Sequence, residues 1–443
     1  PGVKVVVEEG RNFIRSTREN YDIIMLSIPV TKTSRSPEGF ALTENFLFTV
    51  ESINDYLNRL KADGQLIVVA HEDMEIFRLV FTALSALKKR GISPAEAMKH
   101  IYTVGPEIFP VFVLKKSPFT QQEANKVHEN MHKHDYSTHS SFIPFIEQVT
   151  YVIPLGEEIY EEYKMLNDAL YLISQGKLSP DELIESADFD LKAVTDNDPF
   201  FYKFELGLPS ILTFLLILSV IAMIGGWLIK PGYLREIKVP GKNILFLTFF
   251  SSLGIGFMLI EIPLIQKFIL FLGQPTYSVA MLLFSLLVSA GIGSWLSGIL
   301  WESRTLLKLR IAVIMVSALT GLHILFLDQV FTFFLGTSFF IRIFVSFVLL
   351  LPLGLFLGMP FPLGMKLLDE LGLQQYVPRM WGVNGIGSVL GSTLAIALAI
   401  SFGFSYALFL GIISYFSLFI IFSLSLIGEQ KALITQKTDL TGI

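Results

Sequence analysis

Long apolar runs dominate the second half of the chain, between residues 209 and 427. A helix needs roughly 20 predominantly apolar residues to cross a bilayer core of about 30 Å. A buried helix of a soluble protein can imitate one such run, but not a whole series of them. The pattern therefore predicts an all-α membrane domain of about seven transmembrane helices. The windows are Pro209–Ile229, Ile244–Pro263, Tyr277–Leu300, Leu307–Leu327, Phe339–Met359, Val377–Ile400 and Phe404–Ile427.

Few polar side chains interrupt these windows. Glu261 lies in the second window, and Gln266 and Lys267 follow it closely. An ionisable side chain inside a bilayer is costly and is a candidate functional group. The other interpretation is that Glu261 and Lys267 lie near a helix end and pair or reach the interface, because Pro263 is expected to break the helix between them. The remaining intramembrane polar candidates are Arg342 and Asn384.

Glycines recur at small-residue spacing in two of the windows. Such spacing lets helix backbones approach closely, so it predicts helix packing. No strand precedes the second cluster, so its G-x-G pattern is not a dinucleotide fingerprint. The segment Met359–Gly364, with two prolines, predicts a broken helix end that either lines a site or forms a turn. The glycines are Gly291, Gly293 and Gly298 in one window, and Gly382, Gly385, Gly387 and Gly391 in another.

The first 200 residues show a different pattern, in which short apolar runs alternate with helical periodicity. Such alternation is typical of an α/β domain with a doubly wound parallel sheet. Serine or threonine followed three residues later by glutamate marks three helix starts, at Ser93, Thr120 and Ser179. The predicted strands are Val3–Val7, Asp22–Leu26 and Gln65–Ala70, and a β-rich stretch covers Ile101–Leu114; the predicted helices are Asn12–Ser16, Leu42–Leu60 and Glu72–Arg90.

Composition supports a division into an α/β domain at residues 1–200, a membrane domain at residues 209–427 and a polar tail at residues 428–443. Only 16% of the 443 residues are charged, against roughly 25% in soluble domains. Without cysteine, the chain can form no disulfide, thiolate metal site or cysteine nucleophile. No basic aromatic stripe suggests nucleic acid. Because Val3–Val7 begins almost at the first residue, the chain is expected to be an N-terminally truncated fragment.

The charges are divided unequally between the two parts. Residues 1–200 hold 20 Lys and Arg against 30 Asp and Glu, whereas residues 201–443 hold 14 against 9. With seven spans, one membrane face receives eleven basic residues, and the positive-inside rule makes that face cytoplasmic. The α/β domain would then lie outside the cytoplasm, unless one span is miscounted. The eleven are Lys230, Arg235, Lys238, Lys242, Arg304, Lys308, Arg310, Lys366, Arg379, Lys431 and Lys437.

One short motif fits a metal site. His128 and His132 flank Glu129 in the H-E-x-x-H spacing, which places two histidines on one helix face with the glutamate as base. The segment is rich in histidine and very polar, so a solvent-exposed helix is the competing interpretation. No third ligand stands out, although Glu147 and Glu157 are available. A zinc protease rests on this motif alone.

The order of motifs resembles a known family. VVVEEGRNFI, YDIIMLSIP, ALTENFLFTV and YLNRLKADGQLIVV are similar to the second half of a spermidine/spermine synthase domain. GIGFMLIEIPLIQKFILFLGQPTYSVAMLLFSLLVSAGIGS, LGMPFPLGMKLL and WGVNGIGSVLGS look like the multi-spanning tails of prokaryotic spermidine-synthase-like membrane proteins. The resemblance covers nearly the whole chain. It implies a class I methyltransferase-like fold, a multi-pass prokaryotic cell membrane location and an adenosyl ligand.

The resemblance also assigns individual positions. It implies that Glu9 and Gly10 contact the adenine side of S-adenosylmethionine, decarboxylated S-adenosylmethionine or a related ligand. The catalytic aspartates of the aminopropyltransferases correspond to Ser27 and Val30 in this chain. Neither side chain can pair with an ammonium group or act as base. Polyamine synthesis is therefore not expected, although the family bears that name.

Two further hypotheses of function stay open besides the protease. The first is a membrane-anchored, adenosyl-ligand-dependent transferase that acts on a small molecule other than a polyamine. The second is a transporter or membrane scaffold whose soluble domain is a degenerate, non-catalytic nucleoside-binding module. Glu261, Arg342 and the broken helix end favour the second hypothesis. The bilayer is the partner common to both.

Overall fold

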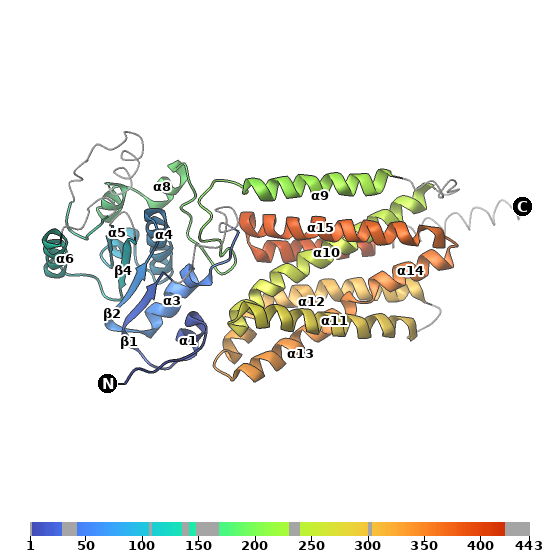
Figure 1. Cartoon of the computed structure of the whole chain (residues 1–443), viewed down its shortest axis with the longest axis horizontal. Coiled ribbons are helices and arrows are strands. Elements are labelled where there is room, and N and C mark those ends of the chain that lie inside the picture. Colours follow the sequence, from blue (N-terminus) through green and yellow to red (C-terminus); the bar gives the residue numbers. More distant parts are fainter. Residues whose placement is uncertain are drawn as a thin grey trace, which may run out of the picture. The chain divides into compact units, whose positions relative to one another are not determined.

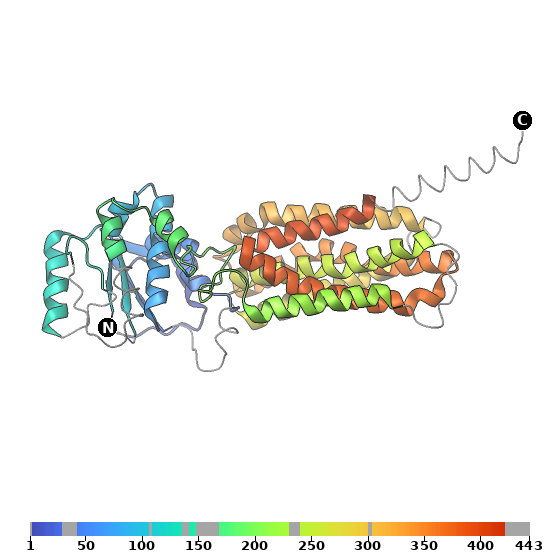
Figure 2. The same cartoon turned by 90° about the horizontal axis from the view of Figure 1, so that it is seen from above.

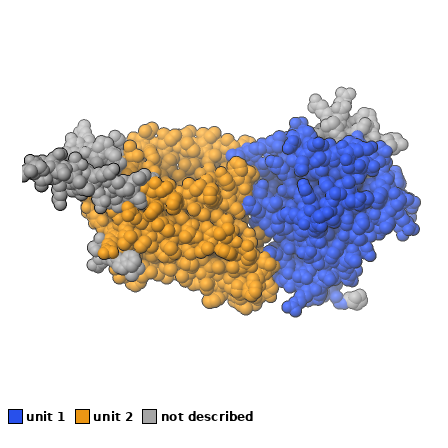
Figure 3. Space-filling view, turned by 180° about the vertical axis from the view of Figure 1, so that it is seen from behind, with its two compact units in different colours: residues 1–209 blue, residues 210–443 orange. Residues whose placement is uncertain are grey.

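A computed structural model describes residues 2–28, 42–105, 109–134, 141–147, 168–229, 240–299 and 304–420. The chain forms two compact units, residues 1–209 and residues 210–443 (Figure 3). The first contains all four strands of the described sheet, and the second is helical (Figure 1). Val30, Glu157 and the tail at residues 428–443 lie outside the described residues.

The sheet of the first unit is mixed. Strands β1 (Tyr21–Ser27) and β2 (Leu60–Val69) are parallel, whereas β4 (Val111–Lys115) runs antiparallel to both β2 and β3 (Ile101–Val104). The order is β1-β2-β4-β3. The α/β class is confirmed, but the prediction of an all-parallel sheet is wrong for β4. Residues 105–110 are too few for a crossover, so β3 and β4 can only pair antiparallel.

Residues 3–7 do not form the predicted strand. They carry no strand assignment, and the side chains of Val3 and Val7 are 92% and 91% exposed. Strand β1 lies at one edge of the sheet, and β2 is its only partner among the described residues. A valine-rich segment becomes a strand only where its backbone groups find a neighbouring strand. The valine pattern gives the propensity but supplies no partner.

The region before β2 also differs from the prediction. The predicted helix Leu42–Leu60 is a 3-10 turn, η1 (Phe46–Phe48), followed by α3 (Val50–Arg59). Strand β2 starts directly at Leu60, and the register slips between Tyr21 opposite Leu60 and Ile23 opposite Gln65. A Cβ on Gly64 would lie 2.8 Å from the Tyr21 carbonyl oxygen. Glycine is therefore required where the irregular part of β2 pairs with the start of β1.

Three helices of the first unit begin at the predicted capping signals. Reciprocal capping boxes form at Thr120 with Glu123 and at Ser179 with Glu182, and the Ser93 side chain accepts from the Glu96 backbone. Helix α4 is followed by Gly91 at φ +82°, as expected for a glycine after a helix end. The helices are α1 (Gly10–Ser16), α4 (Asp73–Lys89), α5 (Pro94–Met98), α6 (Gln121–Lys133) and α8 (Pro180–Ser186).

The second unit contains six helices in its described part that are long and apolar enough to cross a membrane. A shorter apolar helix, Phe404–Ile420, follows them. The helices lie side by side along broadly one direction (Figure 2). This confirms the prediction of a multi-pass membrane region. The helices are α9 (Ser210–Leu228), α10 (Pro240–Leu272), α11 (Pro275–Ile299), α12 (Thr305–Phe334), α13 (Phe339–Leu357), α14 (Pro360–Glu370) and α15 (Val377–Phe402), with the 3-10 turn η2 (Gln374–Tyr376) before α15. Helices α13 and α14 together form one of the six candidate spans.

Pro263 and the proline-containing segment Met359–Gly364 affect their helices differently. Pro263 lies inside α10, which continues to Leu272, so the predicted break between Glu261 and Lys267 is wrong. Neighbouring helices in a bundle can supply new partners for the backbone groups that a proline frees. The predicted break at Met359–Gly364 is confirmed, because α13 ends at Leu357 and α14 starts at Pro360.

Glycine packing is confirmed for part of each predicted cluster. A Cβ on Gly293 would collide with the Leu355 carbonyl oxygen of α13. On α15, a Cβ on Gly387 would lie 2.8 Å from the Ser251 carbonyl oxygen, and a Cβ on Gly391 would lie 2.7 Å from that of Ile255. These three glycines let α11 approach α13 and let α15 approach α10. Added Cβ atoms meet nothing within 4 Å at Gly291, Gly298, Gly382 and Gly385.

Candidate functional site

The carboxyl ends of β1 and β2 lie side by side, because these strands are parallel and Ser27 lies opposite Val69. This side of the sheet, where the two strands end, is called the carboxyl edge below. Open α/β sheets bind ligands at this edge. Backbone strain also gathers here: Ile28, directly after β1, has φ +44°, and its amide donates to the Val69 carbonyl at 3.2 Å. A positive φ at a β-branched residue is an outlier of the kind found at functional sites.

A histidine and a buried glutamate follow β2 at the same edge. One oxygen of Glu75 accepts from the His71 backbone amide at 3.0 Å and lies 3.4 Å from His71 Nδ1. Glu75 lies in the first turn of α4, where the helix dipole favours a carboxylate. It is 1% exposed, whereas the His71 side chain is 14% exposed. A carboxylate on Nδ1 orients the ring so that Nε2 can act as a general base.

A tyrosine adds to this cluster from a distant part of the chain. Tyr202 is buried, and its hydroxyl accepts from Asn45 Nδ2 at 3.5 Å. Burial, together with the nearby charge of Glu75, raises the pKa of Tyr202 far above its usual value. A tyrosine that stays protonated can donate its hydroxyl proton in a hydrogen bond to a developing negative charge. The edge thus combines a histidine–carboxylate pair with a neutral phenol, from three segments of the chain.

Glu9 and Gly10, the predicted adenosyl contacts, form the start of α1. The two Glu9 carboxylate oxygens accept from the backbone amides of Arg11 at 3.1 Å and Asn12 at 2.8 Å. Glu9 is therefore the N-cap of α1. Each carboxylate oxygen has a second lone pair, so the cap leaves capacity for an exocyclic amine. Around Gly10 nothing lies within 4 Å of an added Cβ.

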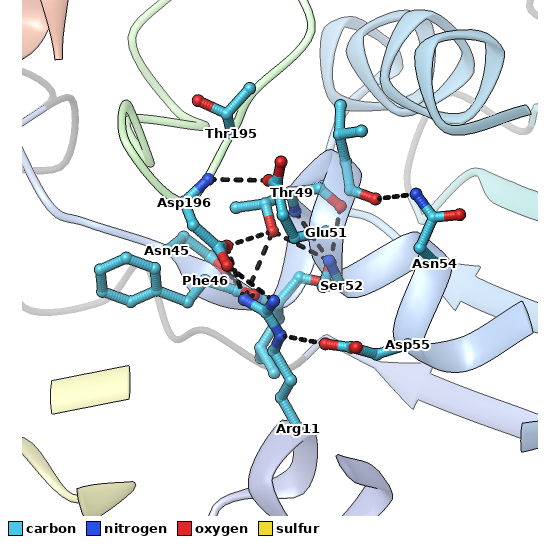
Figure 4. A network of polar contacts seen from close by, with 12 residues as sticks. Arg11, Asn45, Phe46, Thr49, Glu51, Ser52, Asn54, Asp55, Thr195 and Asp196 are labelled. Atoms are coloured by element: carbon cyan, nitrogen blue, oxygen red, sulfur yellow. Dashed lines mark hydrogen bonds and ion pairs between the residues drawn. The ribbon is translucent and has the colours of Figure 1, made fainter. Parts of the chain in front are cut away.

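Immediately after this cap, Arg11 organises a buried network (Figure 4). Arg11 is 2% exposed and forms a bidentate ion pair with Asp196 at 2.7 and 2.8 Å. Its Nε donates to Asp55 at 3.0 Å, and its Nη1 donates to the Phe46 carbonyl at 2.9 Å. Thr49, the cap of α3, donates to Asp196 at 2.6 Å. The network ties α1, the start of α3 and the segment around residue 196 together.

The two carboxylates of this network have different protonation properties. Burial alone would raise the pKa of Asp196, but the Arg11 guanidinium and the Thr49 hydroxyl hold it below its usual range. Burial raises the pKa of Asp55 despite the attraction of Arg11 and Arg15. Each nitrogen of the Arg11 guanidinium already donates a hydrogen bond. The network is therefore a structural clamp.

The two histidines of the H-E-x-x-H motif lie together on α6, with Nε2 atoms 3.1 Å apart. Burial and the neighbouring His132 lower the pKa of His128. No group of three or more potential metal ligands occurs in the described part of the chain. The spacing thus brings two ligands together, but the structure adds no third from the described residues.

Charged side chains of the second unit gather near the carboxyl end of α10. Lys267 forms an ion pair with Asp328 of α12 at 3.2 Å, so its partner is not Glu261. Arg342, in the first turn of α13, is buried and donates to the Phe271 carbonyl at 3.0 Å. Carbonyl groups at a helix end carry partial negative charge and stabilise a cation there. Lys267 and Arg342 therefore belong to the same end of the bundle.

The other predicted intramembrane residues are spread over α10 and α15. Asn384 Nδ2 donates to the Phe250 carbonyl at 3.1 Å, where α15 packs on α10. Glu261 is half-buried in α10, and the described residues supply it with no hydrogen bond or ion pair. Gln266 lies five residues further along the same helix. The structure therefore does not bring the predicted polar residues together in one site.

The comparisons with protein-family models, with curated proteins and with solved structures give no match for this chain. The functional argument consequently rests on the chain's own residues.

The predicted site residues omit the pair at the carboxyl end of β2. His71 and Glu75 directly follow the strand predicted at Gln65–Ala70, so strand-end position alone could have identified them. Nothing in the sequence places Tyr202 or Asn45 beside Glu75. These residues lie far apart in the chain and meet only through the fold.

Proposed function

We propose that the first unit binds an adenosyl ligand and belongs to a membrane-anchored transferase that acts on a small molecule other than a polyamine. The position of β4 carries this proposal. It lies between β2 and β3, its two predecessors in the chain, and runs antiparallel to both. A methyltransferase-like sheet ends in the same way, with its last strand inserted antiparallel between two earlier ones. A fully parallel doubly wound sheet has no such strand.

The carboxyl edge of β1 and β2 is the ligand edge in this proposal, with Glu9 and Gly10 on the adenine side. An adenosyl sulfonium supplies an electrophilic carbon beside a sulfur leaving group. Ser27 and Val30 cannot take a proton from an attacking nucleophile. His71 Nε2, oriented by Glu75, takes that proton while the new bond forms, the carbon–sulfur bond breaks and a neutral thioether leaves.

Calorimetric titration of the full chain in lipid nanodiscs tests ligand binding. S-adenosylmethionine, decarboxylated S-adenosylmethionine and 5′-methylthioadenosine are the probes. We expect binding of at least one of them, weakened roughly tenfold or more by Glu9→Gln, because a carboxylate bond to an amine is a charge-assisted interaction. His128→Gln, on α6, is the control and should bind as the unchanged chain does. Absence of binding by all three probes would reject the proposal.

The role of His71 is separable from ligand binding. His71→Gln keeps a polar side chain but cannot accept the proton. We expect this variant to bind the adenosyl probe unchanged and to lose thioether release, measured with a panel of small amine, thiol and hydroxyl acceptors. General base catalysis typically contributes 10²- to 10⁴-fold in rate. A variant that releases thioether at the unchanged rate would exclude His71 as the base.

Sidedness decides whether a cytosolic adenosyl ligand can reach the unit. The chain has no cysteine, so single cysteines can be introduced at exposed Lys126 on α6 and at exposed Leu371 after α14. Five candidate spans separate Pro209 from Leu371, so the two positions should label from opposite sides with an impermeant maleimide. The transferase proposal requires Lys126→Cys to be protected in intact cells. The eleven basic residues on the opposite membrane face predict instead that Lys126→Cys is labelled in intact cells.

The second candidate function is a transporter or scaffold with a degenerate soluble unit. Glu261 favours it, because a half-buried carboxylate lies inside α10 without an ion pair from the described residues. Reconstituted proteoliposomes would be tested for uptake of radiolabelled amino acids and polyamines with and without a proton gradient. Uptake that Glu261→Gln abolishes would support transport, and Gln266→Ala is the control on the same helix. Failure of the whole panel to enter would count against it.

A further inference from the structure

Arg379 is a buried cation at a helix end of the second unit. It lies in the first turn of α15 and is 7% exposed. Its Nη2 donates to the Trp227 carbonyl at 2.6 Å and approaches the Gly226 carbonyl at 3.4 Å, both in the last turn of α9. These carbonyls have no partner within their own helix and carry partial negative charge. They hold the guanidinium in place but do not neutralise it.

Most of the hydrogen-bonding capacity of Arg379 is unused. Its Nε and Nη1 atoms are buried, and none of the described residues gives them a hydrogen-bond partner. These two atoms carry three N–H groups, and leaving a buried donor without a partner is unfavourable. Among the described residues no carboxylate forms an ion pair with this side chain. Arg11 of the first unit, by contrast, donates from every nitrogen of its guanidinium.

Tyr376 provides a second buried donor beside Arg379. It is 2% exposed, its hydroxyl is buried and interacts with the neighbouring Gln375 side chain, and it interacts electrostatically with Arg379. A phenol can donate one hydrogen bond. The two side chains belong to η2 and the first turn of α15. Together they offer donors, and the described residues add no carboxylate that pairs with Arg379, which is the composition of an oxyanion site.

The position of Arg379 in the bundle indicates which class of anion the site would bind. Arg379 contacts the end of one membrane-spanning helix from the start of another, so it lies near a membrane surface. Trp381, 61% exposed on the next part of α15, is typical of the interface between lipid and water. Phosphate groups of lipids lie at this level. Arginine is also well suited to phosphate, because its planar fork can donate two parallel hydrogen bonds.

We propose that Arg379 and Tyr376 form a binding site for a phosphate group at the end of the bundle where α9 terminates and α15 begins. The group belongs either to an anionic phospholipid or to a water-soluble phosphate. In both cases it accepts hydrogen bonds from Nε and Nη1 of Arg379 and from the Tyr376 hydroxyl. The site involves neither the α/β unit nor its adenosyl ligand.

Native mass spectrometry and thermal unfolding of the full chain test this site in two arms. In the lipid arm, phosphatidylglycerol is added to the chain in a neutral detergent, with phosphatidylcholine as reference. In the soluble arm, inorganic phosphate is titrated. Retained phosphatidylglycerol without an effect of inorganic phosphate identifies a lipid site, and a midpoint that rises with inorganic phosphate identifies a soluble ligand. Either result supports the proposal, and binding of neither probe overturns it.

Three variants locate the site within the chain. Arg379→Gln should weaken binding roughly tenfold or more, because it removes the charge-assisted hydrogen bonds. Tyr376→Phe keeps the buried ring and removes only the hydroxyl, so it remains informative if Arg379→Gln does not fold. It should weaken binding about threefold to tenfold. Arg304→Gln, an exposed arginine before α12, changes the net charge equally and should have no effect. Unchanged binding by Tyr376→Phe together with equal losses for both arginine variants would overturn the proposal.

Discussion

Arg11 of the α/β unit and Arg379 of the helical unit are buried in opposite ways. In the α/β unit, Arg11 is surrounded by carboxylates, with Asp196 and Asp55 both in direct contact. In the helical unit, Arg342 and Arg379 bond to backbone carbonyls at the ends of α10 and α9. A carboxylate neutralises the guanidinium completely, whereas the end of a helix offers only about half an elementary charge. Arg11 is therefore a clamp, whereas Arg379 keeps two guanidinium nitrogens to which the described residues give no partner.

The two units also use glycine differently. In the α/β unit, Gly64 allows β2 to approach the Tyr21 backbone at one irregular position of the pairing between β1 and β2. In the helical unit, Gly293, Gly387 and Gly391 let whole helices approach backbone to backbone. Lipid tails are as apolar as the side chains, so no hydrophobic driving force brings the helices together. Helix association in a membrane therefore depends on close packing. The first unit is thus stabilised largely by burial and ion pairs, and the second largely by the fit between helices.

Removal of the Arg11 partner should give the largest effect. Asp196→Ala leaves a buried guanidinium with one carboxylate fewer, and breaking a buried pair in this way costs about 3–5 kcal/mol. We expect faster hydrogen exchange in α1 and α3, measured by mass spectrometry on the full chain. Asp22→Ala is the control, because its ion pair with Lys61 is exposed and such pairs contribute about 0–1 kcal/mol. Equal protection in both variants would contradict the clamp.

Disruption of the glycine contact in the helical unit should have the next largest effect. Gly293→Val places side-chain atoms against the Leu355 backbone of α13, and overpacking of this kind costs about 1–3 kcal/mol. Gly291→Val is the matched control two residues away, where nothing lies within 4 Å of an added Cβ. Thermal unfolding in detergent should show a lower midpoint for the first variant only. A similar loss in both would indicate that valine itself, and not the contact, is responsible.

The pH dependence of the α/β unit should be smaller. Burial, and then the charge of Asp190, raise the pKa of Asp198 to about 6. The folded state therefore binds a proton more readily than the unfolded chain between about pH 4 and pH 6, and stability falls as pH rises through that window. Acidification from pH 7 to pH 5 should stabilise the unit by about 1 kcal/mol or less. Hydrogen exchange of residues near Asp198 measures this, and Asp198→Asn should abolish it.

Loss of the ion pair in the helical unit should have the smallest effect. Lys267 is mostly buried, but Asp328 is 71% exposed in the absence of lipid, and exposed pairs contribute about 0–1 kcal/mol. Asp328→Asn should therefore shift the midpoint of thermal unfolding in detergent only slightly. A loss comparable to that of Gly293→Val would show that charge pairing, and not helix fit alone, stabilises this unit.

Much of the architecture follows from the order of residues. The apolar windows determined the membrane helices, because hydrophobic length is a local property of the chain. Capping boxes determined the starts of α6 and α8 for the same reason, since each joins residues only three positions apart. The break at Met359 was also predicted from local sequence, because two prolines within three residues remove backbone donors and proline is favoured at the first positions of a new helix.

Other features required the tertiary structure, because they depend on partners distant in the chain. The valine pattern predicted a strand at residues 3–7, but no neighbour in the described sheet pairs with it. Lys267 forms an ion pair with Asp328, and the charge of Glu75 acts on Tyr202. In both cases the partners are too far apart in the sequence for a local pattern to predict the contact. Whether Arg379 faces a carboxylate or a helix end was likewise decided by the packing of α15 on α9. Propensity and length can be read from neighbours in sequence, whereas charge pairing is determined by neighbours in space.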